Sequence, residues 1–415
     1  MNITIFPQRI EGEFNVLSSK SDVIRILICS LFSKENINLK MNNFCDDIKF
    51  GIGAIKSLGK KVNIKDNIIN ISTLYENIDY AEVDCGESGT LLRFLLPCAN
   101  YFANKVRFKG KKGLTKRPIK ELIELLSKHG LLFSGYELPF EVEGELKSGT
   151  YFISGNISSQ YISGLLFILP LLDGNSKIII TSKLESEKYV DMTVNRLNDF
   201  GIHVKKYNNE IFIKGNQNYN PQKCYTAEGD WSYGASLLCL GAVNGDIKLS
   251  GLNMKSVQPD RCILDILSEM EADVKYNDEC VRVKSNLLRG IERNLSGCPD
   301  LFPVIAATAS FAEDNSIFYG INRLIYKESN RLESTSKVLE KLGANLKYDE
   351  NKAIIYPNKK LYDGDIYTFN DHRIAMAASI MGLKSLTPVK IIGAECVNKS
   401  APAFFDCFKE YIKEE

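Results

Sequence analysis

Six small polar residues each stand directly before a long apolar run, and they recur at a nearly constant spacing along the 415-residue chain. They are Ser21, Ser88, Ser158, Ser232, Asp300 and Asp371, which lie 67, 70, 74, 68 and 71 residues apart. Serine and aspartate are favoured N-caps, so the pattern predicts six buried helices that begin at these residues. A helix N-terminus presents free amides and the positive end of the helix dipole. Several such ends turned toward one cleft would bind an anion.

The charged residues point the same way. Arg25 and Arg93 lie inside two of the apolar runs, where a buried charge is costly, so each needs an anionic partner or a path to solvent. Across the chain, 52 Lys and Arg balance 51 Asp and Glu, which disfavours a nucleic-acid-binding protein. His129, His203 and His372 are not spaced as metal ligands. We therefore expect a local anion site and no metal or cofactor.

A second periodic feature is a glycine that ends an amphipathic helix and precedes a strand-like alternation. Glycine suits the left-handed residue after a helix, and alternation predicts a strand. The pattern occurs five times, at Gly59, Gly130, Gly201, Glu271 and Gly343, with Glu271 taking the place of glycine in the fourth copy. Consecutive copies are 71, 71, 70 and 72 residues apart. Together, the two patterns predict six repeats of about seventy residues.

The sixth repeat is cut short by the end of the sequence. Its last helix, near residues 405–412, reaches the C-terminus, whereas Met1 to Phe6 read as a strand with no helix before them. The simplest account is that this first strand completes the last repeat. We therefore expect three repeats in a middle domain, residues 19–226, and three in a terminal domain, residues 1–18 and 227–415, which suits the length of the chain.

The cysteines and the apolar segments bear on location. The eleven cysteines are scattered without a CxxC pair, which predicts reduced thiols in a cytoplasm. The first ten residues lack the pattern of a signal peptide, and the longest apolar run, residues 161–172, is too short to span a bilayer. We expect a soluble, cytoplasmic monomer without membrane or nucleic-acid partners.

Nine short motifs occur in order between residue 19 and about residue 402. They are Ser19-Lys20-Ser21 with Arg25, Gly86 with Ser88-Gly89-Thr90 and Arg93, Lys116-Arg117-Pro118, Ser158-Ser159-Gln160, Glu228-Gly229-Asp230, Pro299-Asp300, Lys327 to Arg331, Asn370 to Arg373, and Cys396 with Lys399. Each motif alone is weak, but nine in this order are specific. The set resembles the 5-enolpyruvylshikimate-3-phosphate synthase family of enolpyruvyl transferases.

This resemblance implies an α/β (α+β) fold, a two-domain inverted α/β barrel with three βαβαββ repeats in each domain and substrates bound between the domains. It also implies transfer of the enolpyruvyl (carboxyvinyl) group of phosphoenolpyruvate to the 5-hydroxyl of 3-phosphoshikimate. The products would be 5-enolpyruvylshikimate 3-phosphate and phosphate, in the shikimate pathway to chorismate and aromatic amino acids. No cofactor or metal is implied.

The resemblance further assigns site residues. For phosphoenolpyruvate these are Lys20, Gly89, Arg117, Gln160, Arg331, Arg373 and Lys399. For 3-phosphoshikimate they are Lys20, Ser21, Arg25, Ser158, Ser159, Gln160, Ser186, Asp300 and Lys327, with Tyr189 near the ring. In catalysis, Asp300 would take the hydroxyl proton, and Glu328 and Lys20 would handle the methyl proton. For Asp371, a role as a plain N-cap and a role in the site are equally consistent with the sequence.

Two alternatives stay open at this point. One is a UDP-N-acetylglucosamine 1-carboxyvinyltransferase, which shares the architecture, although the segment before Arg117 lacks the usual loop cysteine. The other is a non-catalytic relative of RNA 3′-phosphate cyclase. The sequence also departs from the family pattern at Asn330, where an aspartate is usual, so the pairing that orients Arg331 is uncertain.

Overall fold

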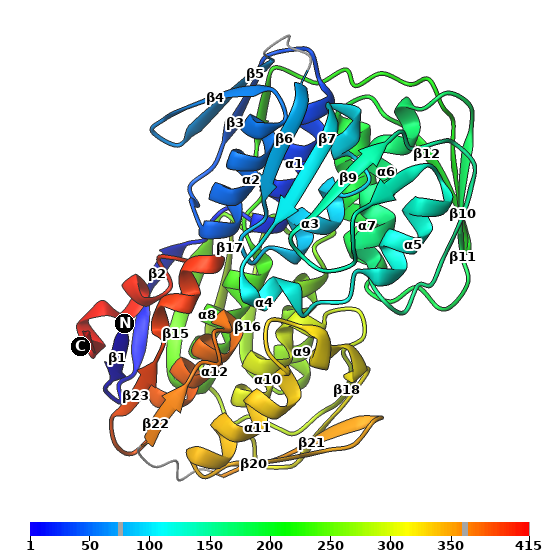
Figure 1. Cartoon of the computed structure of the whole chain (residues 1–415). Helices are drawn as coiled ribbons and strands as arrows, with labels where there is room; N and C mark the ends of the chain where they lie inside the picture. The colour runs from blue at the N-terminus through cyan, green and yellow to red at the C-terminus, as the bar shows by residue number, and fades with distance from the viewer. Residues whose placement is uncertain (74–77, 359–363, 415) are drawn as a thin grey trace. The chain divides into compact units, whose positions relative to one another are not determined.

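The computed structural model describes residues 1–73, 78–358 and 364–414 (Figure 1). Its contacts divide the chain into two compact units. Unit 1 contains Met1–Ser19 and Glu228–Glu415, and unit 2 contains Lys20–Ala227. These bounds lie one residue from those expected from the repeats. Each unit has its own core of buried apolar side chains.

Unit 2 is built from three four-stranded sheets that share one topology. In each sheet the first two strands are parallel and the remaining pairs are antiparallel. The orders are β14-β3-β5-β4, β6-β7-β9-β8 and β10-β11-β13-β12. The strands are β3 (Ile37–Lys40), β4 (Lys60–Lys65), β5 (Ile68–Thr73), β6 (Ile78–Asp84), β7 (Ala103–Lys109), β8 (Leu131–Phe133), β9 (Phe140–Gly144), β10 (Thr150–Ile153), β11 (Ser176–Ile180), β12 (Val204–Tyr207), β13 (Glu210–Ile213) and β14 (Cys224–Thr226).

Two kinds of helix connect these strands. One kind is apolar and buried along most of its length, and we call these the inner helices. The longer of the other helices bury only one face, as expected of amphipathic helices at a surface. The inner helices are α1 (Lys20–Phe32), α3 (Gly89–Leu95) and α6 (Ser159–Ile168), and the others are α2 (Asp46–Ser57), α4 (Lys112–Thr115), α5 (Lys120–Lys128) and α7 (Glu187–Asp199).

Unit 1 repeats this plan. Its sheets have the orders β2-β15-β17-β16, β18-β19-β21-β20 and β22-β23-β1-β24, again with the first two strands parallel. The strands are β1 (Asn2–Ile5), β2 (Ile10–Asn15), β15 (Gly245–Ser250), β16 (Asp273–Tyr276), β17 (Cys280–Lys284), β18 (Glu292–Asn294), β19 (Ser316–Tyr319), β20 (Asn345–Tyr348), β21 (Lys352–Tyr356), β22 (Gly364–Tyr367), β23 (Val389–Ile392) and β24 (Ile412–Glu414).

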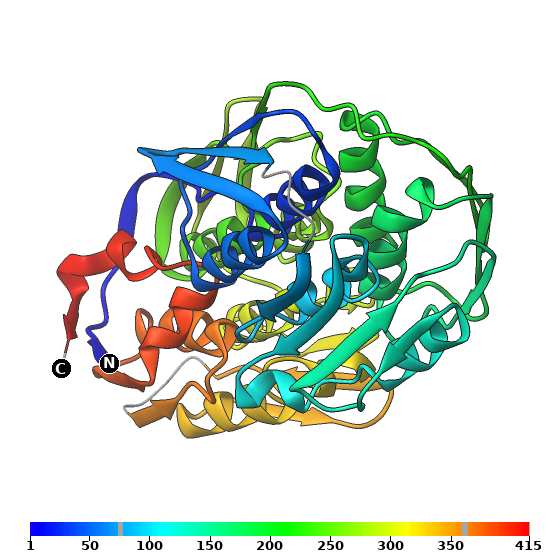
Figure 2. The same cartoon turned by 45° about the horizontal axis from the view of Figure 1, so that its top comes forward.

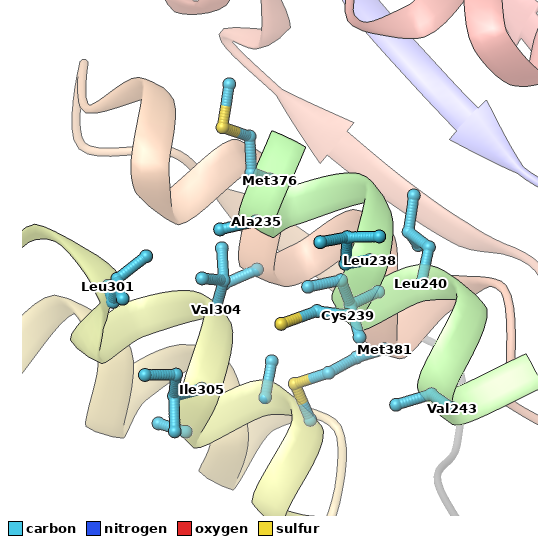
Figure 3. Packing of buried hydrophobic residues seen from close by; sticks show 14 of the residues in the cluster. Ala235, Leu238, Cys239, Leu240, Val243, Leu301, Val304, Ile305, Met376 and Met381 are labelled. Atoms are coloured by element: carbon cyan, nitrogen blue, oxygen red, sulfur yellow. The ribbon is translucent and has the colours of Figure 1, made fainter. Parts of the chain in front are cut away.

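Three inner helices form the centre of unit 1 (Figure 3). Leu238 of α8, Val304 of α10 and Met381 of α12 belong to one buried cluster, and the three helices pack against one another. The inner helices are α8 (Trp231–Asn244), α10 (Phe302–Ala309) and α12 (His372–Gly382). The others are α9 (Ile263–Glu269), α11 (Arg331–Lys341) and the 3-10 helices η3 (Pro259–Cys262), η4 (Pro299–Leu301), η5 (Asn322–Tyr326), η6 (Ala394–Lys399) and η7 (Phe405–Tyr411).

The N-terminal strand completes the last repeat, as predicted. β1 lies between β23 and β24, and it pairs antiparallel with both. Figures 1 and 2 show the two chain ends, marked N and C, close together at this sheet. The sequence prediction of a missing C-terminal strand was incomplete, because residues 412–414 form the short edge strand β24.

The predicted helix ends are confirmed, whereas half of the predicted helix starts are wrong. Gly59, Gly130, Gly201 and Gly343 have positive φ angles, and so does Glu271, at 62°. Ser88, Ser158 and Asp371 are N-caps whose side chains accept backbone N–H bonds.

The other three predicted caps lie just inside their helices. Ser21 is the second residue of α1, Asp230 rather than Ser232 caps α8, and Asp300 is inside η4. The spacing pattern locates a helix start only to within one or two residues.

Candidate functional site

In unit 1, six charged residues form one connected network, which we call the Arg331 cluster. It contains three cations and three carboxylates, contributed by η4, η6, the start of α11, the N-cap of α12 and the segment that follows η5. The members are Asp300, Lys327, Glu328, Arg331, Asp371 and Lys399.

Arg331 is the centre of this network and is only 1% exposed. Its Nε donates to Asp371 Oδ2 at 2.9 Å, and its Nη1 donates to Asp300 Oδ1 at 2.7 Å. Its Nη2 donates to Glu328 Oε2 at 2.7 Å and to Asp371 Oδ1 at 3.2 Å. The guanidinium therefore holds all three carboxylates in fixed positions, as its rigid fork of donors allows.

Two lysines complete the cluster. Lys327 Nζ lies 2.7 Å from Asp300 Oδ1, and Lys399 Nζ lies 3.1 Å from Glu328 Oε1. Each of the two carboxyls that the sequence nominated for proton transfer therefore contacts Arg331 and one lysine.

This environment determines the charge of Asp300. Burial alone would raise the pKa of Asp300, but the charges of Lys327, Arg331 and Arg373 hold it well below its usual value. Burial lowers the pKa of Lys327, and Asp300 partly opposes this shift. Asp300 is thus a carboxylate at neutral pH.

Local backbone features bring these groups together. Asn330 caps α11 by accepting from Glu333 N, which places Arg331 at the first turn. The doubt raised by Asn330 is resolved, because Arg331 is oriented by three other carboxyl groups. Just before α12, residues 369 and 370 both have left-handed φ angles, 54° and 56°, a strained geometry for non-glycine residues that is concentrated at functional sites.

Asp371 has both of the roles that the sequence left open. Its Oδ1 accepts from Arg373 N at 3.0 Å, which caps α12, and its Oδ2 accepts from Arg331 and from Ser329 Oγ. Arg373 itself is 7% exposed and donates from Nη1 to the carbonyl of Ser232 at 3.0 Å.

In unit 2, the start of α1 carries two of the predicted residues. Lys20 Nζ lies 3.0 Å from Asp47 Oδ2 of α2, a carboxyl that is almost fully buried. Arg25, one turn further on, is 2% exposed and donates to Thr193 Oγ1, Ser21 O and Tyr189 O at 2.7 to 2.9 Å.

The expectation that Arg25 needs an anionic partner stays a prediction, because no carboxylate accepts a hydrogen bond from it in the described chain. Its hydrogen-bond partners in the described chain are neutral oxygens, because Asp22 is taken by Arg196 at 2.6 and 2.7 Å. Burial lowers the pKa of Arg25 to about 10, so it remains charged at neutral pH. An ionised guanidinium bonded only to neutral groups is suited to an anionic ligand.

The start of α3 lies beside two more cations. A Cβ built on Gly89 would lie 2.8 Å from Arg117 Nη1 and 3.6 Å from Arg93 Nη1. Arg93 Nη1 donates to Gln160 Oε1 at 2.8 Å, and Gln160 Nε2 donates to Thr90 Oγ1 at 2.8 Å. The starts of α3 and α6 are therefore tied together around Gln160.

Three predicted serines lie at helix starts. Ser158 caps α6 by accepting from Gln160 N, and Ser159 is the first residue of this helix. Ser186 precedes α7 with a left-handed backbone, φ 56°, and is 2% exposed. Small hydroxyls beside free helix amides suit the oxygens of a phosphate.

The predicted residues thus fall into two groups. Unit 1 brings together Asp300, Lys327, Glu328, Arg331 and Lys399, with Arg373 next to their N-cap Asp371. Unit 2 holds the rest, at the starts of α1, α3, α6 and α7 and, for Arg117, just after α4. Sequence reasoning missed Asp47, which contacts Lys20, and Ser329, which contacts Asp371. The residues around each of them give no signal of these contacts.

Comparison with known proteins identifies relatives along the whole chain. The family described as EPSP synthase (3-phosphoshikimate 1-carboxyvinyltransferase) matches residues 6–408. The 3-phosphoshikimate 1-carboxyvinyltransferase of Clostridium kluyveri is 38% identical over 414 residues, covering 98% of this chain and 96% of the relative. That of Clostridioides difficile is 36% identical over 423 residues, covering 98% and 97%.

Solved structures show the same fold. EPSP synthase from Acinetobacter baumannii superposes with a TM-score of 0.83 at 22% identity, covering 100% of both chains. The enolpyruvyl transferase NikO from Streptomyces tendae gives 0.79 at 14% identity, covering 99% of this chain and 98% of that one. The predicted fold class, an α/β protein of repeated βαβαββ units, is confirmed.

Proposed function

Because this chain belongs to the EPSP synthase family, it transfers the enolpyruvyl group of phosphoenolpyruvate to 3-phosphoshikimate, and we propose that the two groups of residues described above carry out this reaction. The reaction gives 5-enolpyruvylshikimate 3-phosphate and phosphate on the route to aromatic amino acids. The observation that carries the assignment of roles is the Arg331 cluster, in which both candidate proton carriers contact a lysine and one buried guanidinium.

We propose that 3-phosphoshikimate is bound mainly through hydroxyls, one buried arginine and lysines. Arg25 supports this role because it keeps a charge that its own neutral partners do not cancel. Ser158 and Ser186 support it because they lie at helix starts. The full proposed set is Lys20, Ser21, Arg25, Ser158, Ser159, Gln160, Ser186, Asp300 and Lys327.

Phosphoenolpyruvate carries a carboxylate and a phosphate, and planar guanidinium groups bind such groups in pairs. The close approach of Arg117 to Gly89 supports a site where backbone and guanidinium meet the same ligand. Arg331 donates to three carboxyl groups. Its role therefore includes holding these groups in position as well as binding phosphoenolpyruvate. The full proposed set is Lys20, Gly89, Arg117, Gln160, Arg331, Arg373 and Lys399.

The chemistry requires three proton movements, one at the 5-hydroxyl and two at the methylene carbon. The methylene carbon of phosphoenolpyruvate gains a proton and becomes a methyl group while the 5-hydroxyl oxygen bonds to the neighbouring carbon. The adduct then loses a methyl proton and phosphate. We propose that Asp300 takes the hydroxyl proton as the C–O bond forms, and that Glu328 and Lys20 serve the methyl group. The lysines and arginines would stabilise charge that develops on the phosphate.

A phosphate-release assay tests the reaction. The full-length protein is incubated with phosphoenolpyruvate and either 3-phosphoshikimate, UDP-N-acetylglucosamine or no acceptor. We expect phosphate only with 3-phosphoshikimate. Release with the nucleotide sugar would favour the second enolpyruvyl transferase, and no release with any acceptor would contradict the assignment.

Two variants separate the proton carriers. Asp300→Ala should lower kcat by about 10²- to 10⁴-fold while calorimetry still detects 3-phosphoshikimate, because Arg331 keeps Asp371 and Glu328. Glu328→Gln should slow the exchange of solvent deuterium into the methylene group of phosphoenolpyruvate. Exchange at the wild-type rate would show that Glu328 only orients Arg331 or Lys399.

We also propose a monomeric, cytoplasmic enzyme. All eleven cysteines are free thiols, as in the reducing cytoplasm, and the net charge of +1 offers no general attraction for nucleic acid. No helix in the described part of the chain is long and apolar enough to cross a bilayer. Sedimentation of the purified protein tests the monomer.

A further inference from the structure

Ser232 links two buried charged residues of unit 1. It was predicted to cap α8, but Asp230 has that role. The carbonyl of Ser232 accepts from Arg373 Nη1 at 3.0 Å, and its hydroxyl donates to Asp260 Oδ2 through a short hydrogen bond. One residue at the first turn of α8 therefore connects the carboxyl of Asp260 with the guanidinium of Arg373.

Asp260 is buried in η3, next to α8, and is only 1% exposed. Its Oδ1 is buried and has no hydrogen-bond partner in the described chain, and the same holds for Arg373 Nε. Buried polar atoms are nearly always satisfied, so this buried acceptor and this buried donor each have bonding capacity that the described chain does not use.

The charges around Asp260 come from several elements. Burial raises the pKa of Asp260 to about 6, Arg373 of α12 opposes this rise, and Asp300 of η4 and the cap Asp230 add to it. The hydrogen bond from Ser232 favours the ionised form. Cys298 also lies within electrostatic reach. Among the neighbouring charges, that of Arg373 has the largest effect.

We propose that Asp260 is a positioning residue which, when ionised, holds Ser232 and through it orients the Arg373 guanidinium for phosphoenolpyruvate. This inference rests on the proposed role of Arg373 in binding that substrate. It predicts that protonation of Asp260 weakens phosphoenolpyruvate binding while the 3-phosphoshikimate residues of unit 2 are unaffected.

Asp260→Asn in the full-length enzyme tests the proposal, because it keeps the shape of the side chain and removes the charge. We expect KM for phosphoenolpyruvate to rise by about 10- to 100-fold, the cost of a misplaced binding group. KM for 3-phosphoshikimate and kcat should stay close to wild type. Asp246→Asn, at an exposed ion pair with Arg282 on the β15–β17 sheet, is the matched control and should change neither KM.

The pH profile separates positioning from a structural role. Phosphoenolpyruvate itself titrates near pH 6, so the ratio of the variant KM to the wild-type KM is measured from pH 5 to 8. We expect the ratio to be large above pH 7 and to approach one below pH 6, where Asp260 is protonated in the wild type as well. Ser232→Ala, which removes the link but not the charge, should raise the same KM by a smaller factor.

Three results would overturn the inference. They are an unchanged KM for phosphoenolpyruvate in both variants, a ratio that does not depend on pH, or a parallel loss in both KM values and kcat with a lower unfolding midpoint. If the wild type itself releases no phosphate with 3-phosphoshikimate, the proposed function fails first. If the wild type is active and the variants behave like it, only the role of Asp260 is rejected.

Discussion

The Arg331 cluster brings three cations and three carboxylates together around one buried guanidinium. Arg331, Lys327 and Lys399 balance Asp300, Glu328 and Asp371 in a single network. Burying charges is costly, and removing one member of a buried network leaves its partners uncompensated. The network is therefore better understood as a device that holds two proton-carrying carboxyls in place than as a source of stability.

Gly89 offers a direct residue-scale test of the phosphoenolpyruvate site. In Gly89→Ala the added methyl would lie 2.8 Å from Arg117 Nη1, so the flexible guanidinium must move. We expect KM for phosphoenolpyruvate to rise by about ten-fold or more, with 3-phosphoshikimate affinity by calorimetry unchanged. Gly53→Ala in α2, where a Cβ meets nothing within 4 Å, is the control. Equal KM values in the two variants would remove Gly89 from the site.

Lys60, a buried lysine outside the candidate site, should make the stability of the protein depend on pH. It is 3% exposed, donates to Ser33 O and Thr73 Oγ1, and burial lowers its pKa to about 8. Between pH 8 and about 10.4, the pKa of an unfolded lysine, the unfolded chain binds more protons than the folded one. Stability therefore rises with pH across this window.

Lys60→Met should accordingly stabilise the protein at pH 7 by about 1 to 3 kcal/mol, and the gain should disappear near pH 10. Urea unfolding followed by circular dichroism at both pH values measures it. The neighbouring exposed residue gives the control Lys61→Met. A gain that is equal at both pH values would mean that improved packing, not the charge, is responsible.

At the scale of single residues, the sequence predicts which residues belong to the site, but not which side chains they contact. The motifs include Arg25 and Arg331 because they occur in short local patterns. Asp47, Asp260 and Thr193 contact Lys20, Ser232 and Arg25, respectively. Tertiary packing brings each pair together from distant segments, and no local spacing encodes these contacts.

At the scale of elements, the period of the repeats predicts where most helices and strands lie. A helix that ends in a left-handed residue and continues as a strand can be recognised because glycine has a local conformational reason to be there, and Glu271 fits by position alone. Helix starts are less certain, since several Ser and Asp residues compete as caps at each one. Asp230 outcompetes Ser232, two residues away.

The placement of β1 leads to an element-scale prediction. β1 is a central strand whose Ile3 and Ile5 are at most 2% exposed. Deleting residues 1–6 should leave β23 and β24 without the strand that both pair with and expose the core of unit 1, whereas unit 2 keeps its own core. Hydrogen exchange should show lost protection across unit 1 only.

Deleting residues 412–415 is the matched control, because β24 is an edge strand that pairs with β1 alone. It should cause a smaller loss confined to the β1 sheet. Equal loss of protection in both units after the β1 deletion would contradict the separate cores.

At the scale of the molecule, the proposed residues for each substrate come from both units. Binding of one substrate should therefore favour the other if the units respond together. We expect calorimetry to show tighter phosphoenolpyruvate binding in the presence of an unreactive 3-phosphoshikimate analogue. Unchanged affinity would show that the two sites are independent. Trp231, the only tryptophan, is fully buried in unit 1, so its fluorescence reports whether that unit responds.

The interleaved chain path also has a consequence for how the protein is made. A ribosome adds about 5–20 residues per second, and β1 is made long before its partners, which are residues 389–392 and 412–414. Unit 2 can fold as soon as β14 has emerged, because all of its strands lie between residues 37 and 226. At that rate, a nascent chain would carry one folded unit together with an apolar strand, β1, that still lacks its partners for roughly 10 to 40 seconds. This segment is where a chaperone would be most useful.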